Sequence, residues 1–449
     1  MKKYKNYFED LIKINNQLKF LIGFKTKEAI SKYTNTLDDD YMNKLKELIK
    51  KYSETDDIEL QLEINFIKKY LELNIYLCFL ISSYVNEIIN FEYENNHIYP
   101  KKYKKERLRD FNNYVKTIKL NLEKSLKLNI TIPYIICKKF LNQIKSIKKY
   151  NYLYNYIKNY YIKKCRKTIG IYDLPNGNEI YKELIIYNIG INKTPEEIHK
   201  LGLSLIPKNK EIKKKNGYNT KEELLNDCKR YAKYIYENII DKYFYYKPDK
   251  EFNIKKLPKI LEKSSPLAFY NEFTDIVYIN MLYYKECDKN TLYSLIMHEC
   301  FHQYHFRFLK YYKLEKYKIY GYNNIALIEG FAHYMEIYCD NYDDNNEYSL
   351  LRKIRLVADT GINYYKWSYK KTYNYMLKYM PHNKNDIKNE IERYICMPSQ
   401  ALAYTFGKLE ILKLRDEYLS KNKGTIKDFH HILLINGNVS FIYLNKIIK

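Results

Sequence analysis

Apolar residues recur every three or four positions along most of the chain, which is the spacing expected of amphipathic helices. In residues 140–165, FLNQIKSIKKYNYLYNYIKNYYIKKC, lysines fill the positions between the apolar ones. Glycine and proline, which interrupt helices, are scarce before residue 165. We therefore expect residues 1–165 to form an N-terminal helical lobe without a recognisable catalytic motif.

The pattern changes after residue 165 and predicts a second region, residues 166–449. Thr194, Pro195 and Glu197 stand in the order of an N-cap, a first helical residue and the partner of a capping box, so a helix is expected to begin here. The mixture of helical and extended patterns in this region predicts a mostly α fold with a small β element.

Four segments of the second region have distinct patterns. A helix is expected from Lys221 to about Tyr243, and residues 247–258, KPDKEFNIKKLP, are expected to be a linker. Residues 271–284 are rich in β-branched and aromatic side chains, which predicts one or two strands. From residue 291 to the end the pattern is helical again.

The composition is compatible with a large folded core. Hydrophobic residues make up 46% of the 449 residues, which argues against wholesale disorder. The formal net charge is +25, but the lysines are dispersed and no nucleic-acid-binding motif accompanies them. We expect solvated helix faces and no specific nucleic-acid partner, while binding to nucleic acid or to an anionic surface is kept as an alternative.

The cysteines and the apolar segments indicate the cellular compartment in which the protein is expected. Eight cysteines are widely spaced without a C-x-x-C pair, which favours reduced thiols in a cytosol-like compartment. The N-terminal stretch MKKYKNYFEDLIK lacks the apolar run of a signal peptide. The most apolar segment, residues 73–85, is too short to span a bilayer and is expected to be a buried helix. We expect a cytoplasmic protein without a membrane span.

Residues 297–303, MHECFHQ, have the spacing His-Glu-x-x-His within an apolar helical pattern. On a helix, His298 and His302 lie one turn apart on the same face, where two imidazoles can hold one Zn²⁺. Glu299 is rotated by about 100° around the helix from His298. This position suits a general base that acts on metal-bound water. Two histidines that share a polar helix face by chance are the alternative.

A catalytic zinc needs a third protein ligand and one open position. Glu329 follows His302 by 27 residues (329 − 302) in another predicted helix, and we expect it to be the third ligand. His333 and Glu336 lie four and seven residues further on the same helix face, where they can hydrogen bond to the ligands. The alternative for both is an exposed helix residue. His305, after His302, is expected to have no role in the site.

Beyond these residues, several stretches of the chain resemble one family. They are TPEEIHKLGL, MHECFHQ, IEGFAHYME, RLVADTGINYYKWS, ERYICMPSQALAYTFGKLEILKLRDEY and DFHHILLINGNVSFIYL. Together they resemble the domain-of-unknown-function-885 family, which is mostly helical, found chiefly in bacteria and expected to consist of zinc metallopeptidases. The resemblance runs from about residue 165 to the C-terminus, and the stretch around PSQALAYTFGK is its most specific part.

The resemblance implies a two-lobed helical fold with a deep cleft, like that of gluzincin metallopeptidases and similar in plan to carboxypeptidase Taq and thimet oligopeptidase. In that plan His298, His302 and Glu329 are the zinc ligands and Glu299 is the base. Most family members carry an additional Pro-Gly between the glutamate and the second histidine, which this chain lacks. They also have a histidine at Asn363, so a catalytically weakened or inactive member that serves as a binding or interaction module is an alternative.

The motif and the resemblance together predict a zinc-dependent peptidase that hydrolyses short peptides, with one Zn²⁺ per chain. Tyr404 is expected to stabilise the oxyanion, because related clefts use a phenol or an imidazole from a C-terminal helix. The predicted strand at 277–280 is expected to offer an edge to which an extended peptide adds. The sequence does not indicate an oligomeric state.

Several charged residues in the C-terminal half are candidates for contact with substrate. Arg352 and Arg355 precede Asp359 at helical spacing, and Lys408 and Arg415 lie further along the chain. A cation that binds the C-terminal carboxylate of a peptide would make the protein a carboxypeptidase or a dipeptidase. Ordinary ion pairs are the alternative for each of them.

Overall fold

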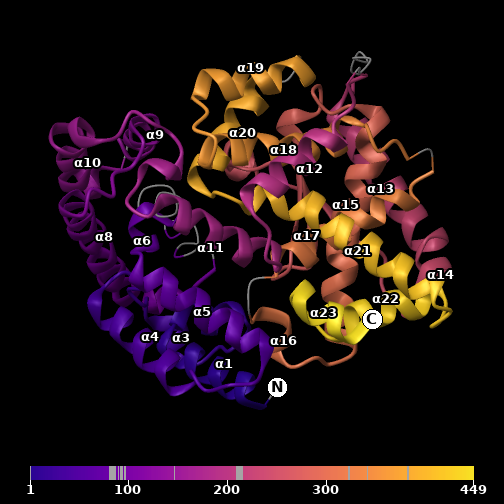
Figure 1. Ribbon diagram of the computed structural model, residues 1–449, viewed down its shortest axis with the longest axis horizontal. Helices are drawn as coiled ribbons and strands as arrows, with labels where there is room; N and C mark the ends of the chain where they lie inside the picture. Colours follow the sequence, from indigo (N-terminus) through magenta and orange to yellow (C-terminus); the bar gives the residue numbers. More distant parts are fainter. Residues whose placement is uncertain are drawn as a thin grey trace. The chain divides into compact units, whose positions relative to one another are not determined.

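The computed structural model is mostly helical with a small three-stranded sheet, which confirms the predicted fold class (Figure 1). The structure describes residues 2–79, 87, 88, 91, 95, 98–145, 147–208, 216–321, 324–340, 342–381 and 384–448. None of the helices in these ranges combines the length and the apolar character needed to cross a bilayer.

The chain divides into two compact units. The first unit comprises Met1–Ile185, Ala358–Tyr375 and Asn383–Ser399, and the second comprises Ile186–Val357, Met376–His382 and Gln400–Lys449. The N-terminal region expected to be a helical lobe, residues 1–165, lies entirely within the first unit. Helices α11 (Gly177–Ile189), α18 (Glu347–Asn363) and α19 (Tyr369–Tyr379) have residues in both units.

The first unit is helical. Its other α-helices are α1 (Lys2–Ile14), α2 (Asn16–Leu21), α3 (Lys27–Ser31), α4 (Asp39–Lys51), α5 (Ile58–Glu72), α6 (Ile75–Cys78), α8 (Lys104–Lys127), α9 (Tyr134–Ile144), α10 (Asn151–Asn159) and α20 (Lys384–Cys396). The described part of this unit also contains the short 3₁₀ helices η1 (Lys101–Tyr103), η2 (Lys148–Tyr150), η3 (Tyr161–Lys164) and η4 (Ile171–Asp173).

Apolar spacing explains these helices. Phe111, Val115 and Leu122 of α8 lie on one buried face because they are three to four residues apart, or a multiple of that spacing. Asp57 caps α5 by accepting a hydrogen bond from a backbone N–H of its first turn. Of the segment 73–85, which was predicted to be a buried helix, Ile75–Cys78 form the buried helix α6, and residues 80–86 lie outside the described residues.

The second unit combines helices with the sheet. Its other α-helices are α12 (Pro195–Leu205), α13 (Lys221–Asn238), α14 (Ile240–Tyr243), α15 (Lys289–Tyr311), α16 (Lys316–Tyr320), α17 (Ile325–Met335), α21 (Ala403–Ser420), α22 (Ile426–Ile435) and α23 (Phe441–Ile448). Its 3₁₀ helices are η5 (Lys259–Ser264), η6 (Met281–Tyr283), η7 (Glu336–Tyr338) and η8 (Gln400–Leu402).

Two helix predictions in this unit are confirmed. Thr194 accepts a hydrogen bond from the N–H of Glu197 at 3.2 Å, and the Glu197 carboxylate accepts one from the N–H of Thr194 at 2.8 Å. This reciprocal capping box begins α12 as expected. The helix predicted from Lys221 to Tyr243 is present as α13 followed directly by α14.

The sheet has the order β1-β3-β2. Strand β1 (Ile254–Lys256) pairs in parallel with β3 (Ile276–Ile279), and β2 (Ala268–Asn271) pairs with β3 in antiparallel register, with Tyr270 opposite Val277. Two predictions need correction. Residues 247–258 are not only a linker, because they contain β1. Strand β3 offers no free edge to a peptide, because it is paired on both sides. The edge strand on the other side of β3 from β1 is β2.

Candidate metal centre

Helix α15 places the His-Glu-x-x-His residues inside the second unit. Nearly every side chain from Thr291 to Leu309 is buried, so this helix is surrounded by other parts of its unit. His298 and His302 are 3% and 9% exposed and follow each other by one helical turn. The helix therefore presents both imidazoles in the same direction from a rigid element.

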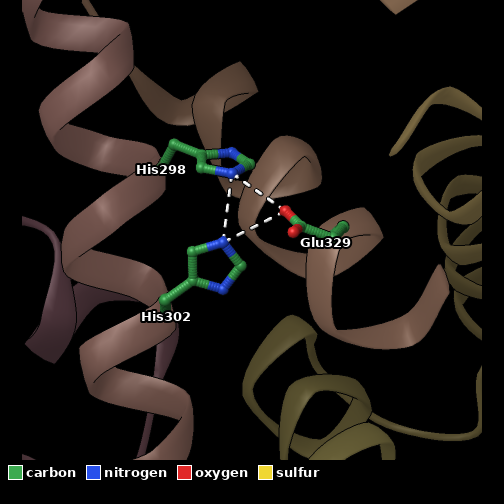
Figure 2. A group of neighbouring side chains, drawn as sticks. All are labelled: His298, His302 and Glu329. Atoms are coloured by element: carbon green, nitrogen blue, oxygen red, sulfur yellow. Dashed lines mark hydrogen bonds and ion pairs between the residues drawn. The ribbon is translucent and has the colours of Figure 1, made fainter. Parts of the chain in front are cut away.

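The two histidines and Glu329 of α17 converge on one point (Figure 2). Nε2 of His298 lies 3.1 Å from Nε2 of His302, and these nitrogens lie 3.3 and 3.2 Å from Oε2 of Glu329. Ligand atoms of a tetrahedral zinc site with bonds of about 2.0–2.1 Å are about 3.3–3.4 Å apart. The three donors therefore fit one zinc ion and leave a fourth position for another ligand.

The electrostatic environment of this group favours a proton on His298. Burial and the charge of Arg352 lower the pKa of His298, but its hydrogen bonds to Glu329 and Glu336 and the charge of Glu299 raise it to about 9. Burial raises the pKa of Glu329, but the two histidines hold it well below its usual range. The carboxylate is thus ionised, and a metal ion has to displace a proton from His298 at neutral pH.

Glu329 reaches the histidines because α17 and α21 cross in contact at two glycines. A Cβ at Gly407 would lie 1.9 Å from the carbonyl oxygen of Ala326, and a Cβ at Gly330 would lie 2.5 Å from the backbone of Gly407. Neither position has room for a side chain. Because Glu329 precedes Gly330 and Tyr404 lies almost one turn before Gly407, the crossing also brings Tyr404 to Glu329.

A buried carboxylate supports His298 from behind. Oε1 of Glu336 accepts a hydrogen bond from Nδ1 of His298 at 2.9 Å, and Oε2 accepts one from the hydroxyl of Ser294 at 2.6 Å. Arg352 forms an ion pair with the same carboxylate at 2.8 Å. Burial raises the pKa of Glu336, but the charge of Arg352 and the hydrogen bond from His298 hold it below its usual value. This arrangement fixes the ring of His298 with Nε2 facing the metal position.

Glu299 is held at the edge of the sheet. Its Oε2 accepts a hydrogen bond from the backbone N–H of Tyr270 in β2 at 2.8 Å, and the side chain is 7% exposed. Glu299 directly follows His298 on α15 and is not one of the three converging ligands. One of its oxygens is thereby oriented by the strand.

Tyr404 of α21 contacts two of the ligands. Its hydroxyl donates a hydrogen bond to Oε1 of Glu329 at 3.0 Å, and its ring is nearly parallel to that of His298, at 17° with a centroid separation of 6.1 Å. The guanidinium carbon of Arg355 lies 4.7 Å from the centre of the Tyr404 ring, which is a cation–π distance. A phenol therefore contacts the ligand set, and a cation lies against the ring of that phenol.

The family assignment rests on more than half of the chain. The profile of a family described as bacterial protein of unknown function, DUF885, matches residues 206–448. This chain belongs to the DUF885 family. No curated protein matches it at a significant level.

Two solved structures share the fold of this DUF885 protein. A lipoprotein candidate from Colwellia psychrerythraea is similar with a TM-score of 0.79 and 19% identity, over 100% of this chain and 97% of that one. A lipoprotein candidate of unknown function from Shewanella oneidensis is similar with a TM-score of 0.67 and 14% identity, over 99% and 98% of the two chains. At these identities the likeness concerns the fold. The cytoplasmic location expected from the sequence stays a prediction.

Two predicted polar neighbours of the ligands differ in their contacts. Glu336 binds His298, as expected for a residue that supports a ligand. His333 is buried on α17, and its Nε2 lies 3.5 Å from the hydroxyl of Ser349. Burial and nearby cations hold the pKa of His333 well below its usual value, so it is neutral. His305 is also buried, and both its ring nitrogens lack a hydrogen-bond partner, consistent with a residue outside the site.

Two of the cations proposed for substrate binding are engaged by acids of the DUF885 chain. Nζ of Lys408 lies 2.6 Å from a carboxylate oxygen of Asp344, which also forms an ion pair with Lys353. Arg415 pairs with Asp416 at 2.7 Å. These are the ordinary ion pairs that the sequence left as the alternative. Two other candidates, Arg352 and Arg355, have their guanidinium carbons 5.7 and 4.7 Å from the centre of the Tyr404 ring, and Arg352 is also paired with Glu336.

Asp359 and Asn363 both belong to the first unit, where they join backbone segments. Asp359 accepts hydrogen bonds from the hydroxyl of Tyr181 at 2.5 Å and from the N–H of Ser399 at 3.0 and 3.1 Å, and burial raises its pKa to about 7. Asn363 donates to the backbone carbonyls of Asp359 and Tyr394, both at 3.1 Å, and accepts from the N–H of Ile171 at 3.2 Å. The amide of Asn363 thus has a structural role.

Three contributors to the centre were missed from the sequence. Ser294 precedes His298 by four residues, so helical spacing contained a signal for its position behind the ligand. The N–H of Tyr270 has no such signal, because every strand residue except proline carries one. The close crossing at Gly330 and Gly407 depends on the pairing of two distant helices.

Proposed function

We propose that this DUF885 protein is a zinc-dependent metallopeptidase that hydrolyses short peptides. The observation that carries the proposal is the convergence of two imidazole nitrogens and a carboxylate oxygen within 3.1–3.3 Å of one another. Two nitrogen donors and one oxygen donor from three side chains are a ligand set of catalytic zinc, which leaves one position open. A zinc ion bound there supplies a Lewis acid that polarises a carbonyl and acidifies a bound water.

Glu299 is the general base of this proposal. It is adjacent to the ligands in sequence, is nearly buried, and has one oxygen fixed by the N–H of Tyr270. The other oxygen would accept a proton from a water molecule and pass it to the leaving amine. Fixing the carboxylate on a strand and a helix limits the reorganisation that proton transfer requires.

Tyr404 is the donor proposed for the oxyanion. Its phenol, which donates to Glu329 at 3.0 Å, is within reach of the ligand set. Rotation of the hydroxyl toward the carbonyl oxygen of a substrate would direct the same proton at the charge that develops during hydrolysis. The neighbouring guanidinium of Arg355 keeps the phenol in a cationic environment.

The edge strand β2 is proposed to bind the peptide backbone. β2 is paired on one side with β3, and the N–H of Tyr270 already serves Glu299. A peptide that adds to β2 in extended form would lie beside the general base. It would be bound through hydrogen bonds to its backbone, independently of its side chains. This position replaces the predicted one on β3.

Arg355 is proposed to favour substrates with a free C-terminal carboxylate. It is the candidate cation whose guanidinium lies 4.7 Å from the ring of Tyr404. A guanidinium can bind a carboxylate through two parallel hydrogen bonds, whereas lysine cannot. We expect peptides with an amidated C-terminus to be cleaved more slowly than free acids, and Arg355→Lys to reduce that difference. Equal rates for both kinds of peptide in the unsubstituted protein would contradict an exopeptidase.

The proposal is tested by Glu299→Gln, which keeps the volume of the side chain and removes the base. We expect this variant to bind about one zinc per chain and to lose hydrolysis of a library of short peptides. Glu286→Gln, a substitution at an exposed glutamate, is the matched control and is expected to leave hydrolysis unchanged. Hydrolysis that persists in zinc-loaded Glu299→Gln would reject the mechanism. Absence of turnover by the unsubstituted zinc-bound protein would favour a binding module.

A further inference from the structure

Two cysteines of the first unit lie together although they are far apart in sequence. Cys137 is in the first half of α9 and is fully buried, and Cys165 follows η3 and is half-buried. The backbone holds the two segments side by side. Pro133, one turn before Cys137, forms a parallel bridge with Arg166, and the N–H of Tyr134 donates to the Arg166 carbonyl at 2.8 Å.

The two thiols are neighbours inside the first unit. The thiol of Cys165 donates to the carbonyl oxygen of Tyr161 at 3.6 Å. The neighbouring thiol of Cys165, followed by burial, raises the pKa of the Cys137 thiol. The backbone bridge between Pro133 and Arg166 therefore already fixes the segments that carry these two neighbouring cysteines.

We propose that Cys137 and Cys165 form a reversible disulfide, which makes this thiol pair a redox modification site of the first unit. The site is independent of the metal centre, whose ligands all belong to the second unit. The resulting cross-link joins α9 to the segment after η3 and encloses α10 and η3 in a covalent loop. The wide spacing of the cysteines in the sequence predicted reduced thiols throughout, so this inference depends on the fold.

The proposed oxidant is a low-molecular-weight disulfide such as glutathione disulfide. The thiolate of the more exposed Cys165 attacks one sulfur of the oxidant, which forms a mixed disulfide and releases one glutathione thiolate. Cys137 then loses its proton and attacks the sulfur of Cys165, which forms the internal disulfide and releases the second glutathione thiolate. The protein loses two electrons and two protons, and the oxidant is reduced to two thiols.

The full-length folded chain is incubated in glutathione buffers of increasing oxidised fraction, quenched with acid and analysed by thiol titration, intact mass and peptide mapping. We expect the number of titratable thiols to fall from eight to six, the mass to fall by two hydrogen atoms, and one cross-linked peptide to join Cys137 to Cys165. Reduction should restore all eight thiols. The measurement uses the unsubstituted protein, so it does not depend on a variant that folds.

Two variants sharpen the test. Cys137→Ser should stop at a mixed disulfide between glutathione and Cys165. Cys396→Ser, at another half-buried cysteine, should still lose two thiols and give the same cross-link. The proposal is overturned if glutathione stays attached to Cys165 in the unsubstituted protein, if all eight thiols persist in the most oxidising buffer, or if the cross-link joins other cysteines. Since zinc binding and peptide hydrolysis are not read out, failure of the proposed function leaves this test unaffected.

Discussion

Replacing Glu336 by glutamine tests whether the buried carboxylate behind His298 prepares that ligand for metal. Glutamine has nearly the same volume and keeps an oxygen that can accept from Nδ1 of His298 or from Ser294. It lacks the negative charge that offsets Arg352, with which Glu336 forms an ion pair at 2.8 Å. The substitution therefore removes one charge from a fully buried network without creating a cavity.

Two effects of this change are expected, one on metal affinity and one on stability. Loss of a carboxylate that orients a metal-bound histidine typically weakens metal binding 10- to 100-fold, which corresponds to about 1.4–2.7 kcal/mol. Leaving the 6%-exposed Arg352 without its partner is expected to lower the free energy of unfolding by roughly 3–5 kcal/mol. The two effects are separable, because the first concerns His298 and the second concerns Arg352.

Zinc affinity is measured by competition with a chromogenic chelator, and stability by urea unfolding of the metal-free protein. The double variant Glu336→Gln with Arg352→Gln should regain most of the lost stability and keep the weakened zinc binding. Ser294→Ala, which removes one hydrogen bond to the same carboxylate, should cost about 1 kcal/mol of stability and weaken zinc less than tenfold. Unchanged zinc affinity in folded Glu336→Gln would refute the supporting role of this carboxylate.

Three further predictions concern other parts of the chain. Gly407→Ala should lower the free energy of unfolding by at least roughly 1–3 kcal/mol and weaken zinc binding, because its Cβ would lie 1.9 Å from the Ala326 carbonyl. Equal urea midpoints for the variant and the unsubstituted protein would contradict the close crossing of α17 and α21. Burial raises the pKa of Glu63 from 4.5 to about 7. Between pH 4.5 and pH 7 the folded state therefore retains a proton that the unfolded state releases, and the free energy of unfolding should fall by roughly 3 kcal/mol as the pH rises through this range. Glu63→Gln should flatten that dependence in urea unfolding at pH 5 and 8, and an identical slope in both proteins would exclude Glu63 as its source. Tyr404→Phe should lower kcat roughly 10²- to 10³-fold with KM and zinc content nearly unchanged, and an unaltered kcat would remove Tyr404 from the mechanism.

The ligand set was predictable from the sequence because it depends mostly on local geometry. Two histidines four residues apart on a helix must share a face, and Glu329 belongs to a short helical segment not far along the chain. Glu336 was a candidate for the same reason, since it lies two helical turns beyond Glu329. The capping box at Thr194 is equally local, and it is confirmed.

The remaining features depend on long-range packing. Arg352 was a candidate for substrate binding, but its side chain meets Glu336 because α18 passes beside η7. Lys408 has the same charge and meets Asp344 instead. Strand β1 was missed because three residues carry too little pattern, and their extended form is imposed by pairing with β3. The sequence shows which charged residues are present, whereas the fold determines which partner each of them contacts.

The central claim is that His298, His302 and Glu329 hold one zinc ion, and elemental analysis of protein purified without added metal tests it most directly. The account predicts about one zinc per chain in the unsubstituted protein and in the control His431→Ala, and almost none in folded His298→Ala and Glu329→Ala. The account would be contradicted if zinc remained at full occupancy in both ligand variants. It would also be contradicted if the unsubstituted protein lacked zinc even after addition of zinc and dialysis.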